Sequence, residues 1–178
     1  LERVNKAGAV FDYKKLDWMN GEYLKSRDPK ELAAELLPAL TARGYQYIEP
    51  NFVADVIELL RERVHFLKGV TDFADYLFGD VLSPLSSELA ASISGNDTLR
   101  TAVKTFRDGL NNASIADLEA FKGLSQSAAE SAGLKMGAFM KPLRLILTHR
   151  EVGADLFGTV HLLGAQRCSV RLDSFLSL

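Results

Sequence analysis

Apolar residues recur at helical spacing along most of the chain, and the clearest run begins at Asp28-Pro29-Lys30-Glu31. Aspartate is a favoured N-cap, proline is favoured at the first helical position, and a glutamate at the third position can reach back to the cap. Four leucines then follow at intervals of a helical turn, at positions 32, 36, 37 and 40, until Gly44 stops the run. The pattern predicts a helix from Pro29 to just before Gly44.

The same reasoning predicts helices along the rest of the chain. Ser83-Pro84 opens one of them, and Ser114 with Asp117 resembles the cap of another. The expected ranges are about 50–69, 71–79, 83–93, 98–107, 114–133, 137–147, 155–163 and 165–176. No segment alternates strictly enough between apolar and polar residues to indicate a strand. We therefore predict an all-α chain of eight to ten short helices.

Composition is compatible with one or two compact domains. The chain has 178 residues, of which 47% are hydrophobic, and no apolar stretch approaches the roughly 20 residues that a membrane span needs. The sequence starts at Leu1 without an initiator methionine, and we expect it to be a fragment of a longer protein. The single cysteine, Cys168, lies on the apolar side of the last expected helix. We therefore expect its side chain to be buried as a small hydrophobic group. A cytoplasmic location is the default expectation for such a chain.

Charge alone does not indicate a nucleic-acid binder, because the formal net charge is −2. The distribution is uneven, however. Between Gly133 and Leu172 there are two acidic residues, Glu151 and Asp155, and six basic ones, which gives a local charge of +4. The basic residues are Lys135, Lys141, Arg144, Arg150, Arg167 and Arg171. A basic patch can therefore form on a mildly acidic body, although a solvated charged face would give the same pattern.

Signals for catalysis and for metal binding do not emerge from the sequence. The three histidines, His65, His149 and His161, are far apart, and no two have the spacing of a helical metal site. The chain contains neither of the glycine-rich phosphate-binding motifs. We assign no catalytic residue and no metal ligand, and the pattern favours a binding module.

Two stretches carry recognisable sequence. The first is residues 9–24, which read Ala-Val-Phe-Asp-Tyr-Lys-Lys-Leu-Asp-Trp-Met-Asn-Gly-Glu-Tyr-Leu. The second runs from Gly133-Leu134-Lys135 through Lys141-Pro142-Leu143-Arg144 and Leu163-Gly164 to Arg171-Leu172. Both resemble the bacterial type of glutamyl-tRNA synthetase, in the region that follows the catalytic fold. His149 and Gly153-Ala154 depart from the family pattern, which has glycine and Gly-Pro there.

The resemblance implies a fold, a function for this chain and a separate catalytic domain in the parent enzyme. The fold would be the α-helix cage type of anticodon-binding domain of a class I synthetase, in two helical subdomains, residues 1–108 and 109–178. The chain would recognise the anticodon loop of tRNA(Glu), in the discriminating form that rejects glutamine tRNA. The family's two catalytic signatures are absent, so the chain should be inactive alone, without a cofactor. ATP and Mg²⁺ would belong to the catalytic domain of the parent enzyme. We expect a monomer that binds neither DNA nor membranes.

Matching the family motifs residue by residue assigns roles to individual side chains. Arg63, in Leu59-Leu60-Arg61-Glu62-Arg63, matches the arginine at the third anticodon base, and Arg144 matches a second arginine near the anticodon. Since Pro142 interrupts helical hydrogen bonding, we expect Arg144 in the first turn of a new helix. Leu156 and Phe157 match an apolar pair near the first anticodon bases, with core packing as the alternative for Phe157. The candidates for phosphate contacts are Arg61, Lys135, Lys141 and Arg150.

Other interpretations remain open at this point. Arg63 can equally form an ion pair with a local carboxylate such as Glu62 or Asp72. The chain can be a helical scaffold for protein–protein contacts, or a paralogue that reads glutamine tRNA. In residues 9–24, we assign Leu16, Trp18, Met19 and Tyr23 to packing, with Trp18 buried.

Overall fold

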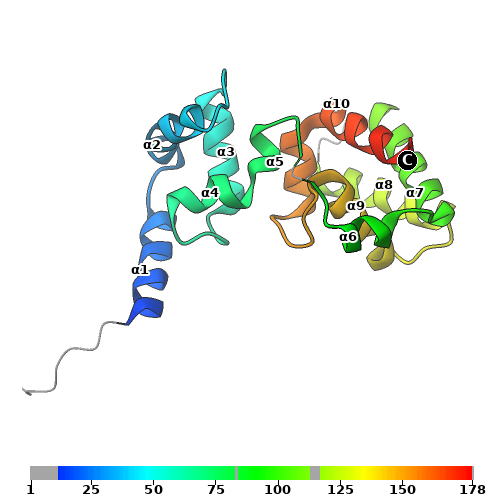
Figure 1. Cartoon of the computed structure of the whole chain (residues 1–178), viewed down its shortest axis with the longest axis horizontal. Coiled ribbons are helices and arrows are strands. Elements are labelled where there is room, and N and C mark those ends of the chain that lie inside the picture. The colour runs from blue at the N-terminus through cyan, green and yellow to red at the C-terminus, as the bar shows by residue number, and fades with distance from the viewer. Residues whose placement is uncertain (1–11, 83, 113–116, 178) are drawn as a thin grey trace, which may run out of the picture.

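A computed structural model describes residues 12–82, 84–112 and 117–177. Within these ranges it contains ten helices and no strand, which confirms the predicted all-α class (Figure 1). The helices are α1 (Tyr13–Ser26), α2 (Pro29–Ala42), α3 (Pro50–Leu60), α4 (Leu67–Phe73), α5 (Asp75–Phe78), α6 (Ser87–Ile93), α7 (Asp97–Asn112), α8 (Leu118–Ser131), α9 (Met136–Thr148) and α10 (Leu156–Leu176). The predicted helix-opening residues Ser83 and Ser114 lie outside the described residues.

The predicted start of α2 is confirmed, whereas α8 begins later than the predicted range of 114–133. Asp28 accepts a hydrogen bond from the backbone N–H of Lys30 at 2.9 Å, and Pro29 is the first residue of α2. Asp117 caps α8 by accepting from the N–H of Ala120 at 2.8 Å. Each cap satisfies a backbone donor that has no partner inside its own helix. Gly44, with φ of 90°, follows the end of α2 as expected.

The end of the chain also follows the sequence pattern, with one correction. Helices are predicted on both sides of Gly164, and α10 is indeed interrupted there, because Gly164 adopts φ 73° and ψ 162°. The prediction that Pro142 starts a new helix is wrong, since α9 runs unbroken from Met136 to Thr148. Proline removes one helical hydrogen bond, but Phe139, Leu143 and Ile146 are buried around it and hold the helix in place.

Two predicted helix ends are wrong for a common reason. The helix expected over residues 50–69 stops at Leu60, and the helix expected to end at Asp108-Gly109 continues to Asn112. Burial decides both cases. Val64 is 6% exposed although it lies in a turn, and Leu110 is 3% exposed although it follows a glycine. Apolar spacing therefore marks the buried face without marking where the helix ends. In addition, α6 begins at Ser87, after an N-cap at Ser86, rather than at Ser83-Pro84.

The helices form two neighbouring groups (Figure 1). Helices α2, α3 and α4 pack on one another, and α7, α8, α9 and α10 form the second group. The first half of α10 lies against α3, and α5 contacts both α4 and α10, so these contacts join the groups. The division into subdomains at residues 108 and 109 stays a prediction, which separate expression of the two segments would test.

An arginine pair on α10 holds the end of α5 against α9 and α10. Arg171 donates to the carbonyl oxygens of Leu147 at 2.6 Å and Tyr76 at 2.7 Å. Arg167 donates to those of Leu77 at 2.9 Å and Gly79 at 2.6 Å. The carbonyls at the end of a helix carry partial negative charge and lack helical partners, so two guanidinium groups suit the end of α5. We call Arg167 and Arg171 the arginine clamp. The clamp corrects the expected basic patch, because these two charges point into the protein.

The first helix departs most from expectation. Leu16, Trp18, Met19 and Tyr23 were assigned to packing, yet they are 40%, 60%, 52% and 66% exposed. Figure 1 shows why, since α1 extends away from the helical body at one end of the molecule. The sequence correctly marks these residues as suited to burial, but the described residues supply no surface that covers them.

Candidate nucleic-acid interface

The turn between α3 and α4 presents Arg63 to solvent. Arg61 closes α3 through its N–H bond to the carbonyl of Ile57 at 2.8 Å, and the N–H of Arg63 bonds back to Leu60 at 2.7 Å. Phe66, in extended conformation, precedes α4. Because Arg63 lies beyond the end of α3, its direction is set by this turn and not by helical geometry.

Arg63 and Arg150 lie around one hollow of about 320 Å³, which we call the Arg63 hollow. It is lined by Arg63, Val64, His65, Phe66, Gly69, Asp72, Phe73 and Arg150. The two arginines come from segments 87 positions apart in the sequence, and α5, which contacts both α4 and α10, brings the segments together. Phe66 is 49% exposed. The hollow therefore combines two guanidinium groups with an accessible aromatic ring.

The acidic groups around the Arg63 hollow are engaged elsewhere. Glu62 pairs with Lys25 at 2.9 Å, and Asp72 pairs with Arg43 at 2.6 Å. The hydrogen bonds that Lys25 donates to Glu62 and Glu22 raise the pKa of its ammonium, which stays charged. Among the residues that the structure describes, the side chain of Arg63 has no ion-pair or hydrogen-bonding partner. The local ion pair considered as the alternative role of Arg63 is therefore not formed with Glu62 or Asp72.

The loop after α9 is held by a small polar network. His149 ends α9 in the left-handed conformation, with φ 54°, which explains why glycine suits this position. The Thr148 hydroxyl donates to the carbonyl of Arg144 at 2.8 Å and accepts from the N–H of Arg150 at 3.1 Å. Arg144 donates to the carbonyl of Ala154 at 2.6 Å. Arg150 pairs with Asp75 at 2.9 Å. Arg144 thus braces the loop, and Arg150 is fixed at the edge of the hollow.

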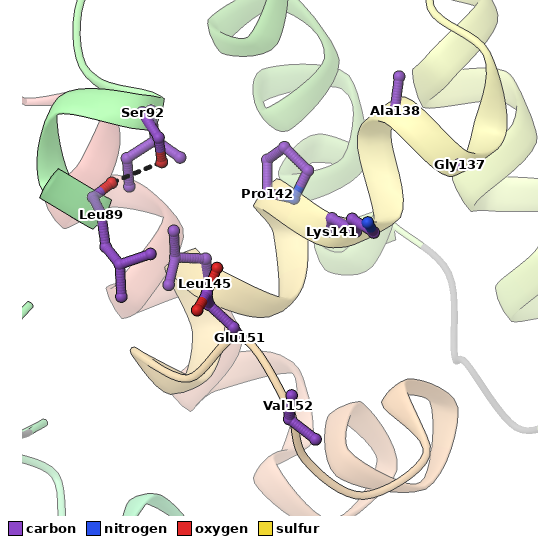
Figure 2. A pocket seen from close by; sticks show the side chains of 10 residues that line it. Leu89, Ser92, Gly137, Ala138, Lys141, Pro142, Leu145, Glu151 and Val152 are labelled. Atoms are coloured by element: carbon purple, nitrogen blue, oxygen red, sulfur yellow. Dashed lines mark hydrogen bonds between the residues drawn. The ribbon is translucent and has the colours of Figure 1, made fainter.

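A second and larger hollow lies on the other side of this loop. We call it the α9 pocket; it measures about 630 Å³. Figure 2 shows Lys141 and Pro142 on α9, Leu89 and Ser92 on α6, and Glu151 and Val152 on the loop around it. Its walls are mainly apolar, with Lys141 and Glu151 as the charged groups. Since Arg150 lines the Arg63 hollow and Glu151 the α9 pocket, one loop borders both.

The structure separates the other predicted site residues from the Arg63 hollow. Arg61 pairs with Glu58 at 2.6 Å, one helical turn back. Lys135 is the exposed N-cap of α9, about 20 Å from the other end of that helix at 1.5 Å per residue. Leu156 is 3% exposed, which makes its side chain part of the core. Phe157 is half-buried, with its ring centroid 5.7 Å from that of Phe121. Packing therefore accounts for both members of the apolar pair.

Phe66 is the residue that sequence reasoning missed. It was placed inside a helix expected to run to residue 69, where an aromatic residue between His65 and Leu67 carries no signal of its own. Val64 and Leu67 continue the apolar spacing of α3, so periodicity conceals the turn. The turn after α3 places the ring of Phe66 at the surface, which apolar spacing alone does not indicate.

Residues suited to other chemistry are buried or scattered. Cys168 is buried, as predicted, and burial raises the pKa of its thiol from 9.0 to about 12. Within residues 12–82, 84–112 and 117–177, no group of three or more His, Cys, Asp or Glu side chains is arranged to hold a metal ion. None of the helices in these same ranges is both long enough and apolar enough to span a membrane.

Comparison with known proteins identifies the class to which this fold and this surface belong. The sequence model of the family described as "Anticodon binding domain" matches residues 31–176. The chain belongs to this family. The exposed arginines and Phe66 lie inside the matched region.

The similar proteins point to one kind of enzyme within this family. The chain is 32% identical to glutamate–tRNA ligase of Moorella thermoacetica over 178 residues, which cover 97% of the chain and 36% of the ligase. It is 33% identical to that of Thermobifida fusca, covering 99% of the chain and 38% of the ligase. A crystal structure of the glutamate–tRNA ligase of Elizabethkingia meningosepticum superimposes with a TM-score of 0.83 at 23% identity, over 98% of the chain and 34% of the ligase. The chain thus spans less than two-fifths of these relatives, and corresponds to their C-terminal part.

Proposed function

We propose that this chain reads the anticodon loop of tRNA(Glu), as the C-terminal part of a glutamate–tRNA ligase. In this proposal, Arg63 donates hydrogen bonds to the third anticodon base and Phe66 packs against an unpaired base. The observation that carries the proposal is the Arg63 hollow, where an exposed arginine lies beside an exposed aromatic ring while Glu62 and Asp72 pair with other cations.

The chemistry of the Arg63 hollow suits unpaired nucleotides. Bases of a single-stranded loop can leave the stack, pack on an aromatic or guanidinium plane and expose their hydrogen-bonding edges. A guanidinium provides five donors in a flat fork, so it can stack on one base or bind the edge of another. A base edge that accepts two hydrogen bonds would be discriminated by about 1–3 kcal/mol. We propose on this basis that the protein prefers tRNA(Glu) to glutamine tRNA.

Neighbouring nucleotides would lie along the loop after α9. Arg150 would contact a phosphate at the edge of the Arg63 hollow, in exchange for part of its pairing with Asp75. Lys141, at the edge of the α9 pocket, would contact another phosphate (Figure 2). Arg144 would act near the anticodon by bracing the loop through Ala154. Lys135 and Arg61 would add charge at longer range, and phosphate contacts of this kind give affinity without sequence preference.

The proposal extends to the parent protein. The remainder of a glutamate–tRNA ligase would bind ATP with Mg²⁺ and glutamate, and would attach the amino acid to the tRNA. Such a protein would work in the cytoplasm, where translation takes place. The present chain would act as a monomer and contribute tRNA selection, with no catalysis of its own.

The test is a titration of the chain with a tRNA(Glu) transcript and with the same transcript carrying an unrelated anticodon loop. Measurements at 50 and 200 mM salt separate loop recognition from general phosphate attraction, which falls steeply with salt. We expect the intact transcript to bind more tightly at both salt concentrations. Equal affinity for the two transcripts would exclude anticodon reading and would favour a protein–protein scaffold.

A further inference from the structure

Helix α1 is attached to the body through its second half alone, as far as the described residues show. Gly21 and Leu24 are buried, and a Cβ atom on Gly21 would lie 2.7 Å from Nδ1 of His65. Lys25 pairs with Glu62, next to Arg63. Residues 12–19, in contrast, are all exposed, and this half of α1 points away from the body (Figure 1).

The exposed half of α1 is nevertheless built as a helix with apolar faces. Asp12 caps it by accepting from the N–H groups of Lys14 at 3.0 Å and Lys15 at 3.2 Å. Leu16, Met19 and Tyr23 share one face at spacings of three and four residues. Trp18 lies about 200° around the helix from Leu16, at 100° per residue. Apolar groups on two sides fit a helix that a partner surrounds, and two helical turns without packing are only marginally stable in water.

The comparisons indicate what covers this surface. The anticodon-binding family matches from residue 31 onwards, so α1 lies outside the family's own domain. The glutamate–tRNA ligases match over 97–99% of the chain, which includes α1. Because they match through their C-terminal part and are more than twice as long, the rest of each ligase precedes the matched segment. Helix α1 thus lies where that preceding part meets the anticodon-binding domain.

We propose that the domain that precedes this region in glutamate–tRNA ligases packs around α1 through apolar surfaces. It would cover Leu16, Met19 and Tyr23 on one side of the helix and Trp18 on the other, four residues that we together call the α1 docking face. Helix α1 then spans two domains. Its second half contacts His65 and Glu62, on either side of Val64 and next to Arg63, so docking fixes the orientation of the Arg63 turn relative to the preceding domain. The inference concerns a surface separate from the RNA-binding hollow and does not depend on which tRNA is read.

Two chimaeric proteins test the docking face. In each, the 178 residues replace the matched C-terminal segment of one ligase, either that of Moorella thermoacetica or that of Thermobifida fusca. Backbone hydrogen exchange of residues 13–19 is then compared between the chimaera and the isolated chain. We expect exchange to slow by about ten-fold or more in the chimaera, because docking adds local stability.

Matched variants localise the effect. The double change Leu16→Glu and Met19→Glu should restore fast exchange of residues 13–19 in the chimaera. Val170→Glu, at a residue 60% exposed on α10, is the control and should leave that exchange slow. Exchange of α7 serves as the internal measure of folding in every sample.

Two outcomes would overturn the docking proposal. One is equal exchange of residues 13–19 in the isolated chain and in both chimaeras. The other is a dimer of the isolated chain, seen by sedimentation and lost in the double variant, which would make a second copy the occupant of the face. Binding of tRNA(Glu) by the isolated chain is measured separately, so a failure of the proposed function would be distinguished from either outcome.

Discussion

Two pairs of arginines differ in the direction of their guanidinium groups, one pair towards the protein interior and the other towards an open hollow. The clamp residues Arg167 and Arg171 direct their guanidinium groups into the protein, where carbonyl oxygens of Tyr76, Leu77, Gly79 and Leu147 accept their hydrogen bonds. Arg63 and Arg150, in contrast, line an open hollow. Arg171 is 7% exposed, and burial lowers the pKa of its guanidinium to about 10, still far above neutral pH.

This comparison shows that charge available for binding differs from charge counted along the sequence. The clamp arginines add to the local charge of +4 between Gly133 and Leu172, yet they stabilise the end of α5 and the α10 interface. Arg63 lies outside that stretch and is the most accessible candidate for base recognition. A chain of net charge −2 can therefore present a basic site, provided that neighbouring carboxylates pair elsewhere.

The largest effect is expected from breaking the clamp. Arg171→Met should lower the free energy of unfolding by about 3 kcal/mol or more, because two buried carbonyls lose charged hydrogen bonds worth roughly 1.5–3 kcal/mol each. Urea denaturation followed by circular dichroism measures the change. Arg63→Ala is the matched control and should lower the free energy of unfolding by less than about 0.5 kcal/mol. Equal losses in the two variants would erase the distinction between structural and binding arginines.

A smaller loss is expected from Gly164→Ala. Gly164 has φ 73° and ψ 162°, a conformation open almost exclusively to glycine, and it sets the direction of the helical segment that carries the clamp. We expect a loss of roughly 1–3 kcal/mol in the free energy of unfolding. Ala165→Gly, one position further along α10, serves as a control for altered helix propensity. A Gly164→Ala protein as stable as the parent would show that the interruption of α10 is not required.

Arg150→Ala should affect RNA affinity in a different manner from the clamp variants. If Arg150 contacts a phosphate, its removal weakens binding to intact and loop-exchanged tRNA by similar factors and reduces the salt slope by about one. The loss of its partly exposed pair with Asp75 should cost no more than about 1 kcal/mol of stability. Filter binding over a series of salt concentrations provides the slope. An unchanged slope would remove Arg150 from the phosphate contacts.

The smallest effect concerns Cys168, which lies on α10 between the clamp residues. Burial raises the pKa of its thiol from 9.0 to about 12, so the native protein at pH 8 should react with a thiol reagent at least roughly a hundred-fold more slowly than the unfolded chain. As the pH rises, the Cys168 thiol loses its proton at a lower pH in the unfolded state than in the folded state. Consequently, stability from this group is complete below pH 9 and is lost as the pH rises towards 12. Rapid labelling of Cys168 in the native protein at pH 8 would contradict the burial of its thiol beside the clamp.

Features set by local chemistry were predictable from the sequence. Asp28-Pro29 identifies the start of α2, and Gly164 marks the break in α10, because capping and glycine conformation depend on a few adjacent residues. The family resemblance indicates the anticodon-binding fold, which the comparisons confirm. It also predicts Arg63 as a site residue, and the structure places Arg63 at the surface.

Features set by tertiary contacts were not predictable. The end of α3 at Leu60 is hidden because Val64 is buried in a turn just as it would be in a helix. The inward direction of Arg167 and Arg171 depends on carbonyls about 90 positions away in the sequence. The packing assigned to Trp18 is not found among the described residues, since the sequence shows that a side chain suits burial without showing which surface covers it.

The most direct test of the account is a thermodynamic cycle on Arg63 and the third anticodon base. Affinities are measured for the parent chain and Arg63→Ala, each with tRNA(Glu) and with a transcript changed at that base alone. The account predicts that Arg63→Ala lowers affinity for tRNA(Glu) by about 1–3 kcal/mol and has little effect on the changed transcript. Equal effects of Arg63→Ala on the two transcripts would contradict the assignment of Arg63 to the third base.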